Sequence, residues 1–142
     1  MNKLSSVSKF FRVECQTEID ILGISEDSRN IKSGYLFVAL RGVNSHGITF
    51  LDDAILNGAA CILSDQPQSN NINIPYIFDK DLKQKIAKFL FKFHELDADH
   101  FLFHGVTGTN GKTSTAFMAH QMVRKLDKPS CYIGTFGAII ND

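Results

Sequence analysis

The sequence predicts an α/β fold in two unequal parts. A small α/β domain is expected over residues 1–98, followed over residues 99–142 by the beginning of a domain with a parallel sheet. In the first part, short apolar runs alternate with helical patterns. A short polar stretch, residues 95–100, separates the parts, and in the second part a glycine-rich loop lies between an apolar run and a helical pattern. The apolar share of 44% and the charged share of 21% are those of a folded globular chain.

Three apolar runs of the first part predict strands. The first is apolar throughout, which is typical of a strand buried on both faces. After it, residues 51–57 form a short helical pattern with Thr49 as a candidate cap and Gly58 placed to end it. Pro75 opens the third run, at a position where a missing N–H is tolerated. The predicted strands are residues 35–40, 59–63 and 75–78.

An amphipathic helix is predicted after the third strand. Its apolar residues recur at steps of three and four, and either Asp79 or Asp81 is expected to cap its start. The lysines lie mostly elsewhere around the helix, and we interpret them as a solvated face in preference to a partner-binding patch. The apolar positions are Leu82, Ile86, Phe89, Leu90 and Phe93, and the lysines are Lys83, Lys85, Lys88 and Lys92.

The second part has the order strand, loop, helix and strand. Residues 101–106 are predicted to form a strand that runs into the glycine loop, and residues 112–126 to form a helix. Residues 131–135 are predicted to form a second strand of the same sheet. This order is typical of the opening of a parallel α/β nucleotide-binding domain. The expected apolar face of the helix consists of Ala116, Ala119, Val123 and Leu126.

Charge and composition argue against several classes of protein. Fifteen basic and fifteen acidic residues give a net charge of zero, which argues against a nucleic-acid partner bound through a broad basic surface. No stretch approaches the roughly 18–20 apolar residues needed to cross a bilayer, and the first residues show no secretory signal. We therefore expect a cytoplasmic protein, with Cys15, Cys61 and Cys131 as buried, reduced thiols.

The glycine loop has the chemistry of a phosphate site. Gly108 and Gly111 allow tight turns in which backbone N–H groups converge, and the positive end of a helix dipole follows at once. Lys112 is placed to offset charge on terminal phosphates, and the Thr113 hydroxyl to bind Mg²⁺. The alternative is a glycine turn that only joins a strand to a helix, and Val106 stands where the general P-loop pattern has its first glycine.

Two segments carry a resemblance to a known family. Residues 105–113, GVTGTNGKT, closely resemble the ATP loop of the Mur ligases, which build the peptide stem of bacterial cell-wall precursors; folate-polyglutamate ligases carry a similar loop. Residues 27–42, DSRNIKSGYLFVALRG, resemble the first-domain signature of the Mur ligases that add the third residue or the terminal dipeptide. The Asp-Ser-Arg start of that segment, Gly-Thr-Asn in the loop and residues 133–137 favour the ligases that add the third residue.

The resemblance implies that residues 1–98 bind the uridine diphosphate end of UDP-N-acetylmuramoyl-L-alanyl-D-glutamate. Ser28 is the first candidate, since its hydroxyl can donate to a uracil carbonyl or a phosphate oxygen. Two alternatives stay open for Asp27 and Arg29: contact with the ligand, or a turn in which they pair with each other. The implied UDP-substrate-binding residues are Glu26, Ser28, Val43, Asn44 and Ser45.

Other titratable residues receive structural interpretations. His46 is expected to shape a turn and not to act in catalysis. Asp52 and Asp53 stand at a helix start, where carboxylates favour the helix dipole. No ligand role is assigned to the remaining histidines, which are scattered along the chain: His94, His100, His104 and His120.

By the same resemblance, residues 99–142 begin an ATP-binding domain that uses ATP and Mg²⁺. In the family's reaction ATP phosphorylates the D-glutamate side-chain carboxylate, and the amine of a diamino acid attacks the acyl phosphate. Lys112 is the one catalytic residue implied within this chain, because it stabilises phosphate charge. The implied ATP-binding residues are Gly108, Thr109, Asn110, Gly111, Lys112, Thr113 and Ser114, with Thr113 also the metal ligand.

The expected function is that of the N-terminal part of an ATP-dependent amide-forming ligase, as a truncated reading frame or an excised piece. A working ligase of the family is several hundred residues long, so we expect no turnover from these 142 residues alone. Two alternatives stay open. One is a non-catalytic module that binds the UDP-sugar peptide, and the other is a ligase of the dipeptide-adding type.

Overall fold

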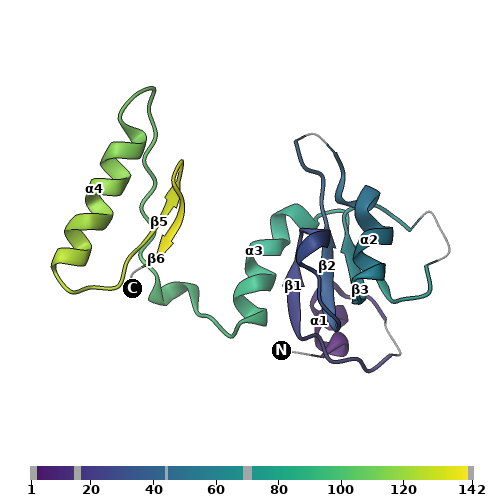
Figure 1. Ribbon diagram of the computed structural model, residues 1–142. Helices are drawn as coiled ribbons and strands as arrows, with labels where there is room; N and C mark the ends of the chain where they lie inside the picture. Colours follow the sequence, from purple (N-terminus) through teal and green to yellow (C-terminus); the bar gives the residue numbers. More distant parts are fainter. Residues whose placement is uncertain (1–2, 15–16, 44, 69–71, 141–142) are drawn as a thin grey trace. The chain divides into compact units, whose positions relative to one another are not determined.

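The computed structural model describes residues 3–14, 17–43, 45–68 and 72–140. The predictions for Cys15 and Asn44 concern residues outside these ranges. The chain divides into two compact units, Met1–Ala98 and Asp99–Asp142. The α/β fold class is confirmed, with a parallel four-stranded sheet in the first unit (Figure 1). No helix in the described ranges is long and apolar enough to pass through a bilayer.

The sheet of the first unit has four parallel strands, in the order of the sequence. The three predicted strands are confirmed, and Pro75 precedes the last of them, where its carbonyl accepts the N–H of Ile62 at 2.9 Å. One further strand comes before them; it is three residues long and includes a glycine and a serine, so no apolar run marks it in the sequence. The strands are β1 Gly23–Ser25, β2 Tyr35–Ala39, β3 Ala59–Ser64 and β4 Tyr76–Phe78.

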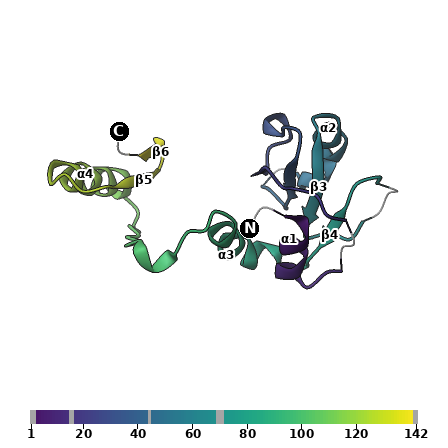
Figure 2. The ribbon, with the colours of Figure 1, turned by 90° about the horizontal axis from the view of Figure 1, so that it is seen from below.

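Helices cover both faces of this sheet. Successive residues of a strand point to opposite faces, so Leu36 and Phe37 of β2 belong to different apolar clusters. On the face of Leu36 lie α1 (Leu4–Phe11) and α3 (Leu82–Phe93), and on the face of Phe37 lies α2 (Leu51–Leu56). Figure 2 shows α1 beside α3. Coverage of both faces explains why β2 and β3 are apolar along most of their length.

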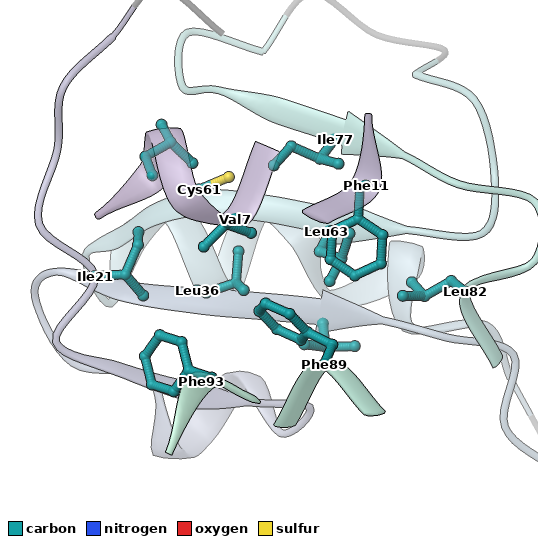
Figure 3. Packing of buried hydrophobic residues seen from close by; sticks show 12 residues of the cluster. Val7, Phe11, Ile21, Leu36, Cys61, Leu63, Ile77, Leu82, Phe89 and Phe93 are labelled. Carbon is teal, nitrogen blue, oxygen red and sulfur yellow. The ribbon is translucent and has the colours of Figure 1, made fainter. Parts of the chain in front are cut away.

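Phe89 of α3 lies within the larger cluster (Figure 3). Its side chain is fully buried, and its ring centroid lies 5.4 Å from that of Phe10, 5.0 Å from that of Phe11 and 6.0 Å from that of Phe93. The predicted helix and its apolar face are therefore confirmed. Other buried members of the cluster shown in Figure 3 are Val7, Ile21, Leu36, Cys61, Leu63, Ile77 and Leu82.

The helix caps of the first unit differ in part from the prediction. Thr49 does not cap α2, because it lies in the 3₁₀ turn Gly47–Phe50 and its hydroxyl donates to the carbonyl three residues earlier, at 2.8 Å. At α3, the N-cap residue Asp81 makes no side-chain cap bond, whereas the Asp79 carboxylate accepts the Asp81 N–H at 2.8 Å. Gly58 follows α2 as predicted, at a φ of 95° that favours glycine.

The second unit contains the predicted helix, α4 (Lys112–Lys125), and an antiparallel pair of strands, β5 (Cys131–Gly134) and β6 (Gly137–Ile140). The predicted strand over residues 101–106 is wrong, because this segment pairs with no strand of the described chain. β5 forms at its predicted place, but its predicted parallel pairing is also wrong, since its partner is β6 across a tight turn. Gly137, at a φ of 84°, supplies a left-handed residue for that turn.

Burial along α4 differs in part from the prediction. Ala119 and Leu126, on the predicted apolar face, are exposed. Ala116 and Val123, the other two predicted positions, are partly buried. The covered face also carries Phe117 and His120, whose rings pack against Tyr132 of β5. The face of α4 that packs against the small sheet is therefore the one that carries these two rings. A short 3₁₀ turn, Ala98–His100, comes before α4 in the sequence.

The two described cysteines differ in burial. Cys61 is fully buried in β3, as predicted. The prediction for Cys131 is wrong, since this residue is exposed at the start of β5. A strand in a pair covered by one helix leaves part of its side chains open to solvent, whereas β3 is covered on both faces.

Candidate functional site

The candidate site lies at the carboxyl edge of the parallel sheet. All four strands run in the same direction, so the segments that follow them meet at one edge, which is the usual place for a ligand in an open α/β sheet. The predicted UDP-substrate-binding residues stand in the first two of these segments. The segments after β1, β2, β3 and β4 begin at Glu26, Leu40, Asp65 and Asp79.

A cleft of about 770 Å³ opens at this edge. Of the predicted UDP-substrate-binding residues, Glu26, Ser28 and Ser45 line it. Val43 is not among the lining residues, and its side chain is fully exposed, whereas Asn44 lies outside the described ranges. Predicted residues from two separate segments are thus brought to one cavity.

Ser28 opens the 3₁₀ turn Ser28–Asn30, three residues after the end of β1. The residue is only 6% exposed, and its hydroxyl makes no hydrogen bond to any residue in the described ranges. Its carbonyl accepts Nδ2 of Asn57, at the end of α2, at 2.9 Å. The backbone of Ser28 is therefore fixed while its hydroxyl can still donate to a ligand.

Asp27 and Arg29 pair with each other, which is one of the two predicted alternatives. The Asp27 carboxylate accepts the Arg29 backbone N–H at 3.0 Å and the Arg29 Nη2 at 2.6 Å. The Arg29 side chain and then its backbone N–H hold the pKa of Asp27 below its ordinary value, and the carboxylate raises the pKa of Arg29. The pair orders the turn that carries Ser28, and direct contact with a ligand stays a prediction.

The loop after β2, residues 40–47, closes on itself. The Gly47 N–H donates to the Leu40 carbonyl at 2.8 Å, and the Gly42 N–H donates to the Ser45 carbonyl at 2.9 Å. A Cβ on Gly47 would lie 2.8 Å from the backbone of β2, so only glycine fits where the loop returns to the sheet. The closed loop presents Gly42 and Ser45 to the cleft.

His46 shapes the turn after this loop, as predicted. Its Nδ1 accepts the Ile48 N–H at 3.0 Å, and its Nε2 lies 2.7 Å from Oδ1 of Asp65. In the described parts of the chain, no group of three or more histidine, cysteine, aspartate or glutamate residues is arranged to hold a metal ion. The contacts of His46 are thus those of a structural residue.

Besides the paired Asp27 and Arg29, three more charged residues outside the predicted set line the cleft: Arg41, Asp53 and Lys83. Lys83 therefore contributes to the cleft as well as to the solvated face of α3. The order of the elements could have indicated this position, because the first turn of α3 follows β4 and therefore lies at the carboxyl edge. Lys85 differs, because its ammonium binds the Asp79 carboxylate at 2.7 Å.

In the second unit, the predicted ATP-binding residues form the loop before α4 and the first turn of α4, and they are largely exposed. Gly111 is the N-cap residue of this 14-residue helix, at a φ of 77° that favours glycine, and no side chain caps the helix. The first N–H groups of α4 are therefore left without a side-chain acceptor. An uncapped helix start behind glycines is suited to a phosphate.

Two side chains in the first turn of α4 are held by local contacts. The Lys112 ammonium donates to the carbonyls of Gly108 and Thr109, at the start of the loop. The Thr113 hydroxyl lies 3.0 Å from the hydroxyl of Thr135, which follows β5. Lys112 thus stands over the turn where phosphate charge would be placed, and the residues present fit a nucleotide phosphate with its Mg²⁺.

Comparisons with known proteins support the same family. Residues 19–94, more than half of the chain, match the sequence profile of the Mur ligase family, catalytic domain. Over 120 residues the chain is 38% identical to the UDP-N-acetylmuramoyl-L-alanyl-D-glutamate--2,6-diaminopimelate ligase of Fusobacterium nucleatum. The aligned region covers 84% of this chain and 24% of the relative. It is 31% identical over 143 residues to the protein of the same name from Oceanobacillus iheyensis, covering 100% of this chain and 29% of the relative.

A solved structure of a UDP-N-acetylmuramoyl-L-alanyl-D-glutamate--2,6-diaminopimelate ligase shares the fold. The TM-score is 0.66 at 21% identity, and the match covers 94% of this chain and 28% of that one. The chain spans about a quarter of the length of the curated relatives that it matches.

Proposed function

The chain belongs to the Mur ligase family, and on this premise we propose that it is the N-terminal part of an ATP-dependent ligase of peptidoglycan synthesis. The proposed reaction joins a diamino acid to UDP-N-acetylmuramoyl-L-alanyl-D-glutamate. Relatives matched over most of this chain are named as 2,6-diaminopimelate ligases, which makes diaminopimelate the first choice for that amino acid. Because the reaction consumes ATP, we place it in the cytoplasm.

The first unit is proposed to bind the UDP end of the substrate. The observation that carries this proposal is the cleft at the carboxyl edge, where Glu26, Ser28 and Ser45 from two segments line one cavity. Its volume, about 770 Å³, is in the range of small-molecule sites. The backbone of the loop 40–47 is expected to serve the ligand whatever the side chain at Val43.

The second unit is proposed to begin the ATP-binding domain. Gly108–Ser114 would cradle the phosphates, with the uncapped N–H groups of α4 facing them. Lys112 would offset charge on the phosphoryl group, and Thr113 would turn its hydroxyl to Mg²⁺ in place of Thr135. The bound Mg²⁺ would supply charge neutralisation at the transferring phosphoryl group.

A calorimetric titration tests the substrate site. UDP-N-acetylmuramoyl-L-alanyl-D-glutamate is added to the 142-residue chain and to its Ser28→Ala variant. We expect the variant to bind about tenfold more weakly, the effect of one lost hydrogen bond to a charged or buried group. Ser33→Ala, at an exposed serine of the same unit, is the matched control and should bind as the unchanged chain does. If Ser28→Ala bound the UDP substrate as tightly as Ser33→Ala and the unchanged chain do, Ser28 would not belong to the site.

A turnover assay tests whether the 142-residue chain catalyses amide formation by itself. We expect no amide formation from ATP, UDP-N-acetylmuramoyl-L-alanyl-D-glutamate and diaminopimelate with the 142-residue chain, which covers 24–29% of the matched ligases. Product formation would contradict this expectation. The intact mass of the protein in its own cells distinguishes the ligase from a stand-alone binding module, since a product well above 15.9 kDa supports the ligase.

A further inference from the structure

We infer that His46 and Asp65 form a clasp that positions the loop 40–47 for binding of the UDP substrate. This inference deepens the proposed function and rests on it. His46 stands at the end of the loop after β2, and Asp65 is the first residue after β3, so their contact joins two neighbouring segments of the carboxyl edge. Neither residue is among the described residues that line the cleft. The clasp therefore acts through the loop, without touching the substrate.

The contacts of His46 fix the tautomer of its ring. Nδ1 accepts the Ile48 N–H at 3.0 Å, so in the neutral ring this nitrogen carries no proton. The proton is then on Nε2, which donates to Oδ1 of Asp65 at 2.7 Å. Because the acceptor is a carboxylate, this hydrogen bond is charge-assisted and stronger than one between two neutral groups.

The clasp is shielded and has a rigid anchor. The side chains of His46 and Asp65 are 9% and 18% exposed, so water competes less for their hydrogen bond than at the surface. Ser64, the last residue of β3, is fully buried; its hydroxyl donates to the Ala39 carbonyl at 3.0 Å and accepts the Gln66 N–H at 3.1 Å. These two bonds hold the backbone on either side of Asp65.

The loop requires such an anchor because, apart from the contact of His46, the hydrogen bonds of its described residues do not reach the neighbouring strand. The bonds from Gly47 to Leu40 and from Gly42 to Ser45 close the loop on itself. The clasp adds a link from the residue next to Ser45 to the end of β3. Fixing Ser45 before the substrate arrives removes an ordering cost that binding would otherwise have to meet.

Two substitutions of His46 separate the clasp from the turn. In His46→Asn, the side-chain oxygen takes the place of Nδ1 and keeps the acceptor for Ile48, but nothing reaches Asp65. In His46→Gln, the amide nitrogen takes the place of Nε2 and reaches Asp65, but no atom of the longer side chain takes the place of Nδ1 as the acceptor for the Ile48 N–H. Asp65→Ala removes the clasp from the other side, and His94→Asn, at an exposed histidine of the same unit, is the control.

The affinity of the 142-residue chain for UDP-N-acetylmuramoyl-L-alanyl-D-glutamate is the first readout. We expect His46→Asn and Asp65→Ala each to weaken binding roughly tenfold, and the double variant to be no weaker than either. His46→Gln should stay within about threefold of the unchanged chain, because it restores the link. Unchanged affinity in His46→Asn, or loss in His46→Gln alone, would overturn the inference, since only the turn would then matter.

Hydrogen exchange of the amides of residues 45–48 without substrate is the second readout. Faster exchange in His46→Asn and Asp65→Ala than in His46→Gln supports the clasp, and equal exchange in all variants overturns it. If the unchanged chain does not bind the UDP substrate, the proposed function fails, while the exchange experiment still decides whether the clasp holds the loop. Nitrogen NMR of the ring provides a further check: a proton found on Nδ1 would contradict the assigned tautomer.

Discussion

The two units of the chain differ in how far their apolar side chains are covered. In the first, residues such as Leu36, Phe37 and Phe89 have no exposed surface, because helices lie on both faces of the sheet. In the second, the buried residues within the described ranges are His120 and Tyr132. Its exposed large apolar residues are Phe101, Leu102, Phe103, Val106, Met118, Met122, Leu126, Ile133, Phe136 and Ile140.

The difference shows that coverage, more than local pattern, determines what a strand or helix contributes. Both units have strands beside helices, but a pair of strands covers only a narrow face of α4, whereas four strands and three helices enclose a core. The cleft of the first unit is therefore built on a closed core. The glycine loop before α4 is built on a small unit with most of its apolar surface open.

The largest expected effect is on independent folding. Residues 1–98 made alone should unfold cooperatively, because they contain the whole two-sided core. Residues 99–142 made alone should not, since they are close to the size, about 40 residues, below which domains usually need a metal, disulfides or a partner. Circular dichroism during heating and amide dispersion in proton–nitrogen spectra measure both. A cooperative transition in the shorter piece would remove the contrast between the units.

The next effect concerns single side chains. Phe89→Ala removes a fully buried ring that packs against three other aromatic rings, and should lower the free energy of unfolding by about 3–5 kcal/mol. Phe103→Ala, at a ring that is 71% exposed in the second unit, should change it by no more than about 0.5 kcal/mol. Denaturant titration of the 142-residue chain, followed by circular dichroism, compares the two. Similar losses would show that Phe103 is covered in solution.

The same contrast explains which elements the sequence predicts. The strands 35–40 and 59–63 and the helix over Leu82–Phe93 are marked by patterns that match the way they are buried. Residues 101–106 also begin with an apolar run, but a strand needs a hydrogen-bonded neighbour as well, which a local pattern does not supply. β1 is the opposite case. The sequence does not predict this strand, because it pairs with β2 without having an apolar run.

The candidate site divides along similar lines. Ser28 and Ser45 are identified from a motif, and the structure brings both to the cleft. Lys83 and Asp65 belong to no motif. Their place at the carboxyl edge depends on the direction and order of the strands, which become known only from the fold. Motifs therefore indicate which segments reach the cleft, and topology adds the residues that lie around them.

A smaller effect is expected from glycine substitutions that differ only in their surroundings. Gly47→Ala places a Cβ 2.8 Å from the backbone of β2, and should lower the free energy of unfolding by about 1–3 kcal/mol. Gly105→Ala, in the second unit, places a Cβ with no atom within 4 Å and should leave stability unchanged or raise it by up to about 1 kcal/mol. Thermal unfolding of the two variants makes the comparison. A larger loss at Gly105 would contradict the exposed course of residues 101–106.

The smallest effect concerns two polar contacts that hold loops, one in each unit. The Asp27–Arg29 pair is charged, and Arg29 lowers the pKa of Asp27. A lowered carboxyl pKa contributes stability above the ordinary carboxyl range, and this contribution is lost as the pH falls through the pKa of Asp27. The contact between Thr113 and Thr135 joins two uncharged hydroxyls, so acid should leave it unchanged.

Carbon NMR of the side chains over an acid titration tests this difference. The Asp27 carboxyl should titrate below the ordinary aspartate range, and Arg29→Gln should move its midpoint upward, because the charged partner is removed. The signals of Thr113 and Thr135 should stay constant through the same interval. An Asp27 midpoint that does not move in Arg29→Gln would mean that the turn is held by its backbone alone. The charged pair would then add nothing to the order of the segment that carries Ser28.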